Sequence, residues 1–95
     1  MYQLFIAAAA DRIFRKLPRR MREEVVTKIS NLALNPYLGE RLSGPLAFLY
    51  SYHFAIFGQY FRAAYTVNAG EKKIIIQYIG PRGEFYKRLR RLFQK

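Results

Sequence analysis

The sequence has no cysteine, no tryptophan, one histidine and only six acidic residues among its 95 positions. Without cysteine, neither a disulfide nor a thiolate-bound metal can contribute to the fold. A single histidine cannot build a zinc site, and no cluster of carboxylates indicates a Mg²⁺ site. We therefore expect the chain to act with no cofactor and no metal.

Long apolar runs are also missing. No segment approaches the roughly 18–20 apolar residues needed to span a bilayer. The stretch from Leu4 to Ala10 is apolar, but no basic segment precedes it, and Asp11 and Arg12 end it too early for a signal peptide. These features predict a soluble, cytoplasmic protein with no membrane partner.

Basic residues are abundant by contrast. Seventeen Lys and Arg residues give a net charge of +11, and residues 81–95 hold six of them against Glu84 alone. So much charge of one sign on a short chain indicates a polyanionic or acidic partner. Nucleic acid is the first candidate, an acidic protein the second and an anionic membrane a distant third.

The length fits one domain, residues 1–95, and the 52 % of apolar residues is sufficient for a core. The patterns described below predict the order β-α-α-β-β-β-α, with no repeat and no linker. This order indicates an α+β fold, in which a small antiparallel sheet of about four strands packs against an N-terminal helical hairpin. The last helix would lie at the edge of the opposite, partly open face.

The first half of the chain predicts one strand and two helices. Residues 2–6 form a short apolar and aromatic strand, and the alanines at 7–10 favour a helix that ends near Leu17. Pro18 is unfavourable inside a helix but suits the first turn of a new one, which Asn35 and Pro36 would end. The two apolar faces, at helical spacing, are Ala10, Ile13, Phe14, Leu17 and Met21, Val25, Ile29, Leu32.

From Phe48 the period changes to two, which predicts strands. Gly58-Gln59 and Asn68-Ala69-Gly70 would form the turns between three strands. Residues 74–79 are the most apolar strand, which suggests an interior position in the sheet. Gly80-Pro81 would end that strand. A helix then follows, with these residues facing inward: Phe85, Leu89, Leu92 and Phe93.

Four residues could carry chemistry on this sheet. Alternation places His53 and Ser51 on one face of their strand, and a hairpin would bring Arg62 close to them. Arg82 follows the last strand, and Tyr86, four residues later, would lie on the same side. Arginine binds phosphate through two hydrogen bonds, while histidine and tyrosine can transfer protons. Such a set would suffice to cleave RNA without metal, with the ribose 2′-hydroxyl as nucleophile.

Each residue also has an ordinary structural explanation. A lone arginine in a strand often protects an exposed sheet edge from aggregation. A lone histidine is often a half-buried polar residue, Tyr86 could simply pack on its helix, and the basic residues of 87–95 could form a solvated face. Residue types alone leave these alternatives open.

Together these segments resemble the RelE/ParE family of bacterial toxins from type II toxin–antitoxin pairs. Residues 16–36, KLPRRMREEVVTKISNLALNP, look like the helical hairpin of the family. RLSGPLAFLYSYHF resembles the segment where a loop enters the second strand of the family fold, and QYFRAAYTV resembles its Tyr-Arg-x-x-Tyr strand. IGPRGEFYKRLRRL is similar to the closing Gly-x-Arg-x-x-x-Tyr segment and terminal helix.

The resemblance implies a fold and two alternative activities. RelE-type members are ribosome-dependent endoribonucleases that cut mRNA, whereas ParE-type members inhibit DNA gyrase and lack the catalytic set. Arg62, Arg82 and Tyr86 match the RelE-type arginines and tyrosine. The family's basic pair in the second strand falls on Ser51 and His53, so that it is only half kept.

The implied mechanism assigns a role to each residue. Arg62 and Arg82 would bind the scissile phosphate, Tyr86 would orient the nucleotide or accept the 2′-hydroxyl proton, and His53 would protonate the leaving 5′-oxygen. An acidic antitoxin would be the partner, and mRNA and ribosomal RNA would bind through Ser51 and the basic helix residues Lys87, Arg88, Arg90 and Arg91. A gyrase inhibitor and a non-catalytic nucleic-acid-binding module remain the alternatives.

Overall fold

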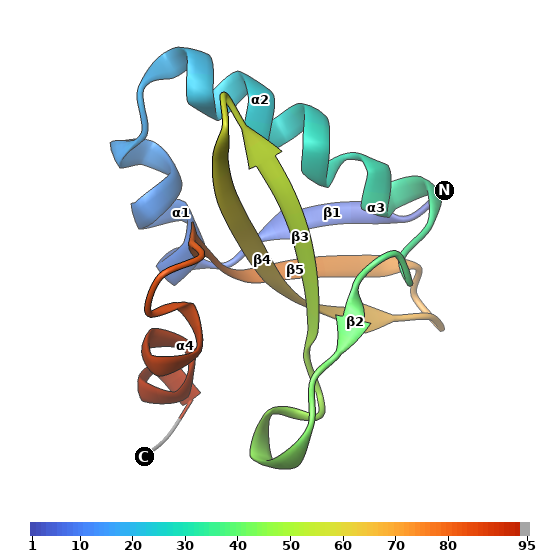
Figure 1. Cartoon of the computed structure of the whole chain (residues 1–95). Helices are drawn as coiled ribbons and strands as arrows, with labels where there is room; N and C mark the ends of the chain where they lie inside the picture. Colours follow the sequence, from blue (N-terminus) through green and yellow to red (C-terminus); the bar gives the residue numbers. More distant parts are fainter. Residues whose placement is uncertain (94–95) are drawn as a thin grey trace.

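A computed structural model describes residues 1–93, which fold into one mixed β-sheet with helices on both of its faces (Figure 1). The sheet has five strands in the order β1-β5-β4-β3-β2. These strands are β1 (Gln3–Ile6), β2 (Glu40–Arg41), β3 (Tyr50–Ile56), β4 (Gln59–Asn68) and β5 (Lys73–Pro81). The α+β class is confirmed, and β5 is an interior strand as its apolar sequence predicts.

The sheet differs from the expectation in two ways. β1 pairs with β5 in the parallel direction, with Leu4 opposite Ile74, so the sheet is not purely antiparallel. A fifth strand, β2, adds two residues beside β3, with Glu40 opposite Ser51. Alternation along a strand identifies its two faces but not the direction of its partner, which explains why the sequence predicts the strands better than their pairing.

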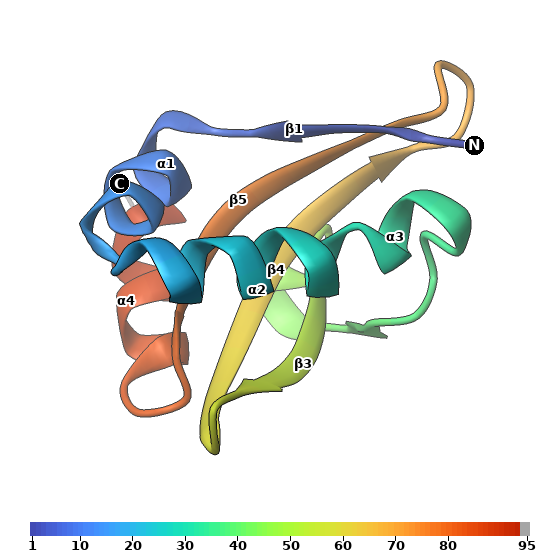
Figure 2. The ribbon, with the colours of Figure 1, turned by 90° about the horizontal axis from the view of Figure 1, so that it is seen from above.

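The N-terminal helices follow the predicted breaks. α1 (Ala8–Lys16) ends before Leu17 and Pro18, which are both extended, and α2 (Arg19–Ile29) begins directly after the proline. A turn at Ser30 separates α2 from the short α3 (Asn31–Leu34). Figure 2 shows α2 and α3 running along one face of the sheet, while α1 lies against β5 at one end of the molecule.

The main core lies between α2 and the sheet face that it covers. Tyr65 and Phe61 of β4 are its largest fully buried side chains. The predicted inner faces of the helices meet here except for Ile13, which packs against the smaller core described below. The buried members of the main core are Ala10, Val25, Ile29, Leu32, Phe54, Ile56, Phe61, Ala63, Tyr65, Ile74, Ile76 and Ile79. Burial of this apolar surface is the dominant favourable term in folding the domain.

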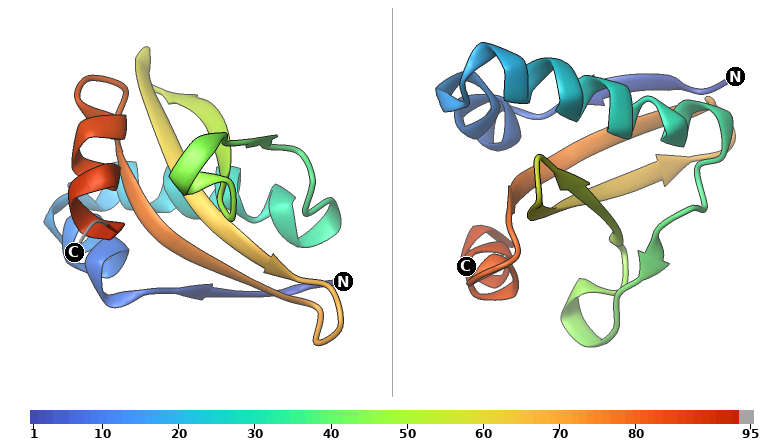
Figure 3. Two further views of the ribbon diagram at one scale, coloured as in Figure 1. Left: turned by 90° about the horizontal axis from the view of Figure 1, so that it is seen from below. Right: turned by 45° about the horizontal axis from the view of Figure 1, so that its top comes forward.

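A smaller core covers part of the opposite face, beneath α4 (Phe85–Phe93) and the loop that contains the 3-10 turn η1 (Gly44–Leu46). Its buried residues are Leu46, Leu49, Ala64, Tyr78, Phe85 and Leu89. The views in Figure 3 place α4 and this loop on the side of the sheet away from α2. This second core fixes the position of α4 and therefore of its side chains.

Two local predictions need correction. The turn between β3 and β4 consists of Phe57 and Gly58, with φ of 49° and 80°, rather than Gly58 and Gln59. Positive φ at both central residues matches the type I′ turn, whose twist suits a two-residue hairpin. Leu92 does not face inward: it is 41 % exposed, because α4 buries only the line of Phe85 and Leu89.

The loop after α3 is held by a buried tyrosine. The Tyr65 hydroxyl donates a hydrogen bond to the Pro36 carbonyl at 2.8 Å and accepts one from the Gly39 backbone N–H at 2.9 Å. A Cβ at Gly39 would lie 2.7 Å from this hydroxyl and 2.8 Å from the Ser51 carbonyl, so no other residue fits without displacement. Tyr65 thereby positions the segment that leads into β2.

We predict that Tyr65→Phe destabilises the protein by about 1–3 kcal/mol, because it leaves a buried carbonyl and a neighbouring N–H without their partner. The free energy of unfolding is measured by urea denaturation. Tyr60→Phe is the matched control, since Tyr60 is 63 % exposed on the same strand and its change should stay within about 0.5 kcal/mol. Equal stabilities of the two variants would contradict this role of Tyr65.

Candidate functional site

The candidate site lies where β3, β4 and β5 pass side by side on the sheet face that α4 partly covers. His53 of β3 is directly opposite Arg62 of β4, and Arg62 is opposite Gly80 of β5. Side chains directly opposite each other on neighbouring strands have Cβ atoms about 4.5–5.5 Å apart. The predicted proximity of His53 and Arg62 is therefore present, with His53 exposed and Arg62 half-buried.

Tyr86 joins this pair from α4. The Arg62 guanidinium carbon lies 4.9 Å from the centroid of the Tyr86 ring, within the range of a cation–π contact. Tyr86 also packs edge-on against Phe85, whose side chain is buried in the second core. The ring is thus held from two sides: its helix is anchored through Phe85 and Leu89, and its face is contacted by a guanidinium from the sheet.

Arg82 lies at the same end of the sheet, but it belongs to a turn and not to the helix that carries Tyr86. Residues 82–84 form a turn rather than helix, with Glu84 at a φ of 60°, and α4 begins only at Phe85. The Arg82 backbone N–H donates to the Tyr60 carbonyl at 3.0 Å. This bond extends the pairing of β4 with β5 by one residue and places an exposed guanidinium side chain beside the site.

The positive charges of this patch act on His53. Although His53 is exposed by surface area, partial desolvation of its imidazole lowers its pKa below the ordinary value of 6.5, and the neighbouring Arg62 and, more weakly, Arg82 lower this pKa further. Glu40 opposes them, because its negative charge favours the imidazolium. His53 is therefore neutral at pH 7 in the free protein. Arg62 and Arg82 thus shift the pKa of the same imidazole in the same direction.

Ser51 does not belong to the exposed patch. It lies on the same face of β3 as His53, as alternation predicts, but its side chain is only 1 % exposed and its Oγ has no hydrogen-bond partner among residues 1–93. In the sheet, Ser51 lies between Glu40 of β2 and Ala64 of β4. The expectation that Ser51 binds RNA is therefore corrected: its hydroxyl is buried and cannot reach a ligand on the surface.

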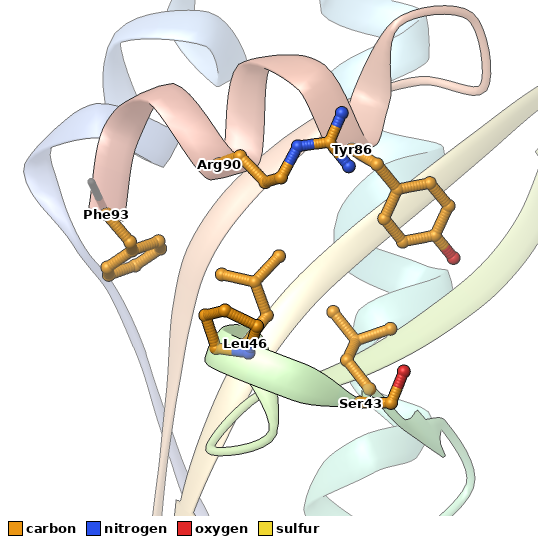
Figure 4. Close-up of a pocket in the computed structure, with 7 residues that line it drawn as sticks. Ser43, Leu46, Tyr86, Arg90 and Phe93 are labelled. Carbon is orange, nitrogen blue, oxygen red and sulfur yellow. The ribbon is translucent and has the colours of Figure 1, made fainter.

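Helix α4 separates its outward-facing side chains onto two flanks. Tyr86, Arg90 and Phe93, at i, i+4 and i+7, line a groove of about 250 Å³ against the loop residues Leu42, Ser43, Pro45 and Leu46 (Figure 4). Arg88, Arg91 and Leu92 face α1 on the other flank. Lys87 is exposed, while Lys95, counted among the terminal cations, lies outside the described residues.

The second flank forms a basic cleft with α1, of about 360 Å³. Arg12 and Lys16 of α1 face Arg88 and Arg91 of α4 across a floor that includes Ile13 and Tyr78. Within residues 1–93, no acidic side chain lines this cleft. Of the four cations that line it, only Arg88 forms an ion pair with a described residue, Glu84, at 3.7 Å. Arg12 and Lys16 are not among the residues that the sequence predicts for the site. Their i, i+4 spacing marks one face of a helix, but nothing in the sequence shows that α4 lies opposite.

A family model for the ParE-like toxin of type II bacterial toxin–antitoxin systems matches residues 4–90. The chain belongs to this toxin family. The sequence matches none of the curated proteins with which it was compared.

Solved structures agree with this assignment of the toxin. In the RelBE2 toxin–antitoxin complex from Mycobacterium tuberculosis, one chain is 26 % identical with a TM-score of 0.72; the match covers 85 % of this toxin and 98 % of that chain. The isolated E. coli RelE toxin is 20 % identical with a TM-score of 0.69, over 98 % and 100 % of the two chains. An archaeal RelE–RelB complex from Pyrococcus horikoshii gives 25 % identity and a TM-score of 0.62, over 86 % and 96 %. The resemblance to RelE and ParE toxins is thus confirmed.

The described part of the toxin was searched for metal-binding clusters and for membrane-spanning helices. Within residues 1–93, no three His, Asp or Glu side chains lie close enough together to hold a metal ion. No helix in the same range combines the length and the apolar character that a membrane span requires.

We predict that the pKa of His53, measured by NMR titration of its imidazole, lies below 6.5 in the free toxin. Arg62→Ala should raise this pKa, because it removes a neighbouring positive charge, and Glu40→Gln should lower it further. The folded state then binds the His53 proton more weakly than the unfolded chain. Stability attributable to His53 is therefore complete above pH 6.5 and is lost as the pH falls through the lower, folded pKa.

His53→Gln, the control, should remove this part of the pH dependence of unfolding. A wild-type pKa at or above 6.5, or one that does not respond to Arg62→Ala, would contradict the arrangement of charges described here.

Proposed function

We propose that this toxin is a ribosome-dependent endoribonuclease that cleaves mRNA without a metal ion and thereby inhibits translation. The observation that supports the proposal is the contact of Arg62 with Tyr86, with His53 directly opposite Arg62 on the neighbouring strand. Arg82 adds a second guanidinium at the same end of the sheet. Two arginines, a phenol and an imidazole on one partly exposed patch provide phosphate binding, base stacking and proton transfer.

The proposed reaction is an in-line attack within the RNA. Arg62 and Arg82 bind the scissile phosphate and stabilise the negative charge that develops on it. Tyr86 orients the nucleotide and, in its phenolate form, accepts the proton of the 2′-hydroxyl as O2′ bonds to phosphorus. The bond from phosphorus to O5′ breaks, and His53 protonates the leaving oxygen. The products are a 2′,3′-cyclic phosphate and a 5′-hydroxyl.

The lowered pKa of His53 sets a condition on its role. A general acid must be protonated before it can act, whereas His53 is neutral at pH 7 in the free toxin. A bound phosphate would compensate the charges of Arg62 and Arg82 and so raise the pKa of His53. Protonation of His53 is therefore coupled to the presence of RNA in the site.

The basic surface beyond the catalytic patch would bind larger partners, namely ribosomal RNA and an acidic antitoxin. The cleft between α1 and α4 places Arg12, Lys16, Arg88 and Arg91 around one depression beyond the catalytic patch. Contacts of Lys and Arg with phosphates make affinity strongly salt-dependent, as expected for docking on ribosomal RNA. An acidic antitoxin that covers the same surface would block this docking. The similar structure from M. tuberculosis is a toxin–antitoxin complex and that from P. horikoshii is a RelE–RelB complex; a pair of this kind would act in the cytoplasm.

A gyrase inhibitor is the second candidate, because the matching family model is described as ParE-like and half of the basic pair is replaced by a buried serine. Such a protein would bind its target through the same surface and cleave nothing. A non-catalytic nucleic-acid-binding module would likewise need none of the proton-transfer groups.

We predict that Arg82→Ala lowers the rate of mRNA cleavage by about 10²–10³-fold, as expected when one donor to a developing oxyanion is removed. Cleavage is measured by mapping mRNA 5′ ends in a translating extract, where wild-type cuts should be phased with codons. The matched control is Arg19→Ala, which removes one exposed arginine from α2 on the opposite side of the sheet.

Gyrase supercoiling is assayed in parallel. Loss of supercoiling without cuts would identify the toxin as a gyrase inhibitor. Cleavage that persists unchanged in Arg82→Ala and in Tyr86→Phe would exclude the proposed site.

A further inference from the structure

Tyr60 of β4 is an exposed aromatic side chain that has no role in the reaction described above; 63 % of its surface is accessible. Five aromatic side chains of residues 1–93 are exposed, and Tyr60 is one of them. The other four each contact a second ring or a cation: Phe5 with Lys73, Tyr37 with Tyr50, Phe48 with Phe93, and Phe57 with Arg20. Tyr60 has no such contact within the described part of the chain, so both faces of its ring are available to a flat group from outside the protein.

The register of the sheet places Tyr60 in the candidate site. Alternation puts it on the same face of β4 as Arg62, and the two Cα atoms are about 6.5–7 Å apart along the strand. Ala55 is directly opposite Tyr60 on β3. Its methyl side chain is too small to cover a phenol ring, which explains why this end of the site face remains open.

Arg82 is the neighbour of Tyr60 on the other side. The Tyr60 carbonyl accepts a hydrogen bond from the Arg82 backbone N–H at 3.0 Å, directly after the pair of Phe61 and Pro81. Tyr60 therefore has one arginine beside it along the strand and another across the sheet. Both arginines are proposed to bind the scissile phosphate, so a base attached to that phosphate lies within reach of the Tyr60 ring.

The positions of the two tyrosines indicate which base this is. Tyr86 contacts Arg62 from α4, whereas Tyr60 lies on the side of Arg62 away from Ala64, which α4 covers. His53, opposite Arg62, is the diagonal neighbour of Tyr60 at about 7–8 Å, a separation that aromatic side chains can span. In the proposed reaction Tyr86 acts at the 2′-hydroxyl and His53 at the leaving 5′-oxygen. Tyr60 is thus on the side of the leaving nucleotide.

We propose that Tyr60 stacks on the base of the nucleotide that carries the leaving 5′-oxygen, so that Tyr86 and Tyr60 hold the two nucleotides on either side of the scissile phosphate. This proposal rests on the proposed RNA cleavage and adds a substrate-binding residue to it. Stacking on an aromatic ring uses the π-face that every base has. Tyr60 therefore contributes affinity and position at this nucleotide but does not select one base over another.

The test is a double-mutant cycle between Tyr60→Ala and the loss of one base. Ribosomes are programmed with mRNA whose codon in the decoding site consists of 2′-deoxynucleotides, which cannot be cleaved by attack of a 2′-hydroxyl. Each of the three codon positions is replaced in turn by an abasic nucleotide, and the affinity of the toxin for every complex is measured. Cleavage is measured in parallel on the all-ribose mRNA.

For the wild-type toxin we expect the abasic nucleotide directly 3′ of the cleavage position to reduce affinity by about tenfold, which is within the range of one lost base stack. Tyr60→Ala should show the same loss on the intact codon and no further loss on the abasic one, because the two changes remove one shared contact. Tyr60→Phe should behave as wild type, since the ring and not the hydroxyl stacks. In cleavage, Tyr60→Ala should raise KM while kcat changes little.

Phe57→Ala is the matched control. It removes a ring that is 64 % exposed from the same hairpin, but this ring lies against Arg20 of α2 and so on the opposite side of the sheet. It should leave the effect of every abasic nucleotide unchanged. Equal melting temperatures of the variants and the wild type show that they are folded.

Three results would overturn the proposal. The first is an unchanged affinity of Tyr60→Ala for the intact codon. The second is a loss in Tyr60→Ala that is equally large on the intact and on every abasic codon, which would mean that the ring contacts the ribosome rather than a base. The third is a loss confined to antitoxin binding, which would assign Tyr60 to the protein interface.

The binding measurements separate this proposal from the proposed function. A toxin that cleaves no codon, but in which Tyr60→Ala is coupled to the base at one codon position, would overturn the nuclease and support the stacking of Tyr60. Cleavage that depends on Arg82, with no coupling between Tyr60→Ala and any base, would support the nuclease and overturn the stacking. A toxin that binds none of the programmed ribosomes would contradict both.

Discussion

The packing of α4 on the sheet is the constraint on which the site depends. Phe85 and Leu89 of α4 are buried against Tyr78 of β5 and Ala64 of β4 in the second core. This contact brings Tyr86 over Arg62, which otherwise would be a lone cation in a strand. It also opens a groove on one flank of the helix and a basic cleft on the other. Loss of the second core would separate these features while leaving the main core beneath α2 intact.

The charges around His53 are the second feature of the candidate site. Arg62 and Arg82 both lower the pKa of His53, whereas Glu40 raises it. An anion bound beside the two arginines would offset their charge and raise the pKa of His53. The net charge of +11 extends the same argument to the whole surface, which an acidic protein or a polyphosphate chain complements.

The sequence predicts most of the local structure because the chain marks it clearly. Pro18 sets the boundary between α1 and α2, and period-two alternation separates the faces of β3 and β4 correctly. The proximity of His53 and Arg62 follows from that alternation and the short hairpin. The burial of Ser51 does not, because it depends on segments that pack against β3 in the folded domain. Alternation assigns a face but not what covers it.

The sequence by itself determined the charge, the succession of helices and strands, and the residue types available for chemistry, since each of these follows from composition or from neighbours a few positions apart. Only the tertiary structure decided that β1 runs parallel to β5, that Arg82 enters the site from a turn rather than a helix, and that α4 divides its cations between two flanks. These properties arise from contacts between segments distant along the chain. Such contacts depend on the packing of whole faces against one another, which local periodicity does not encode.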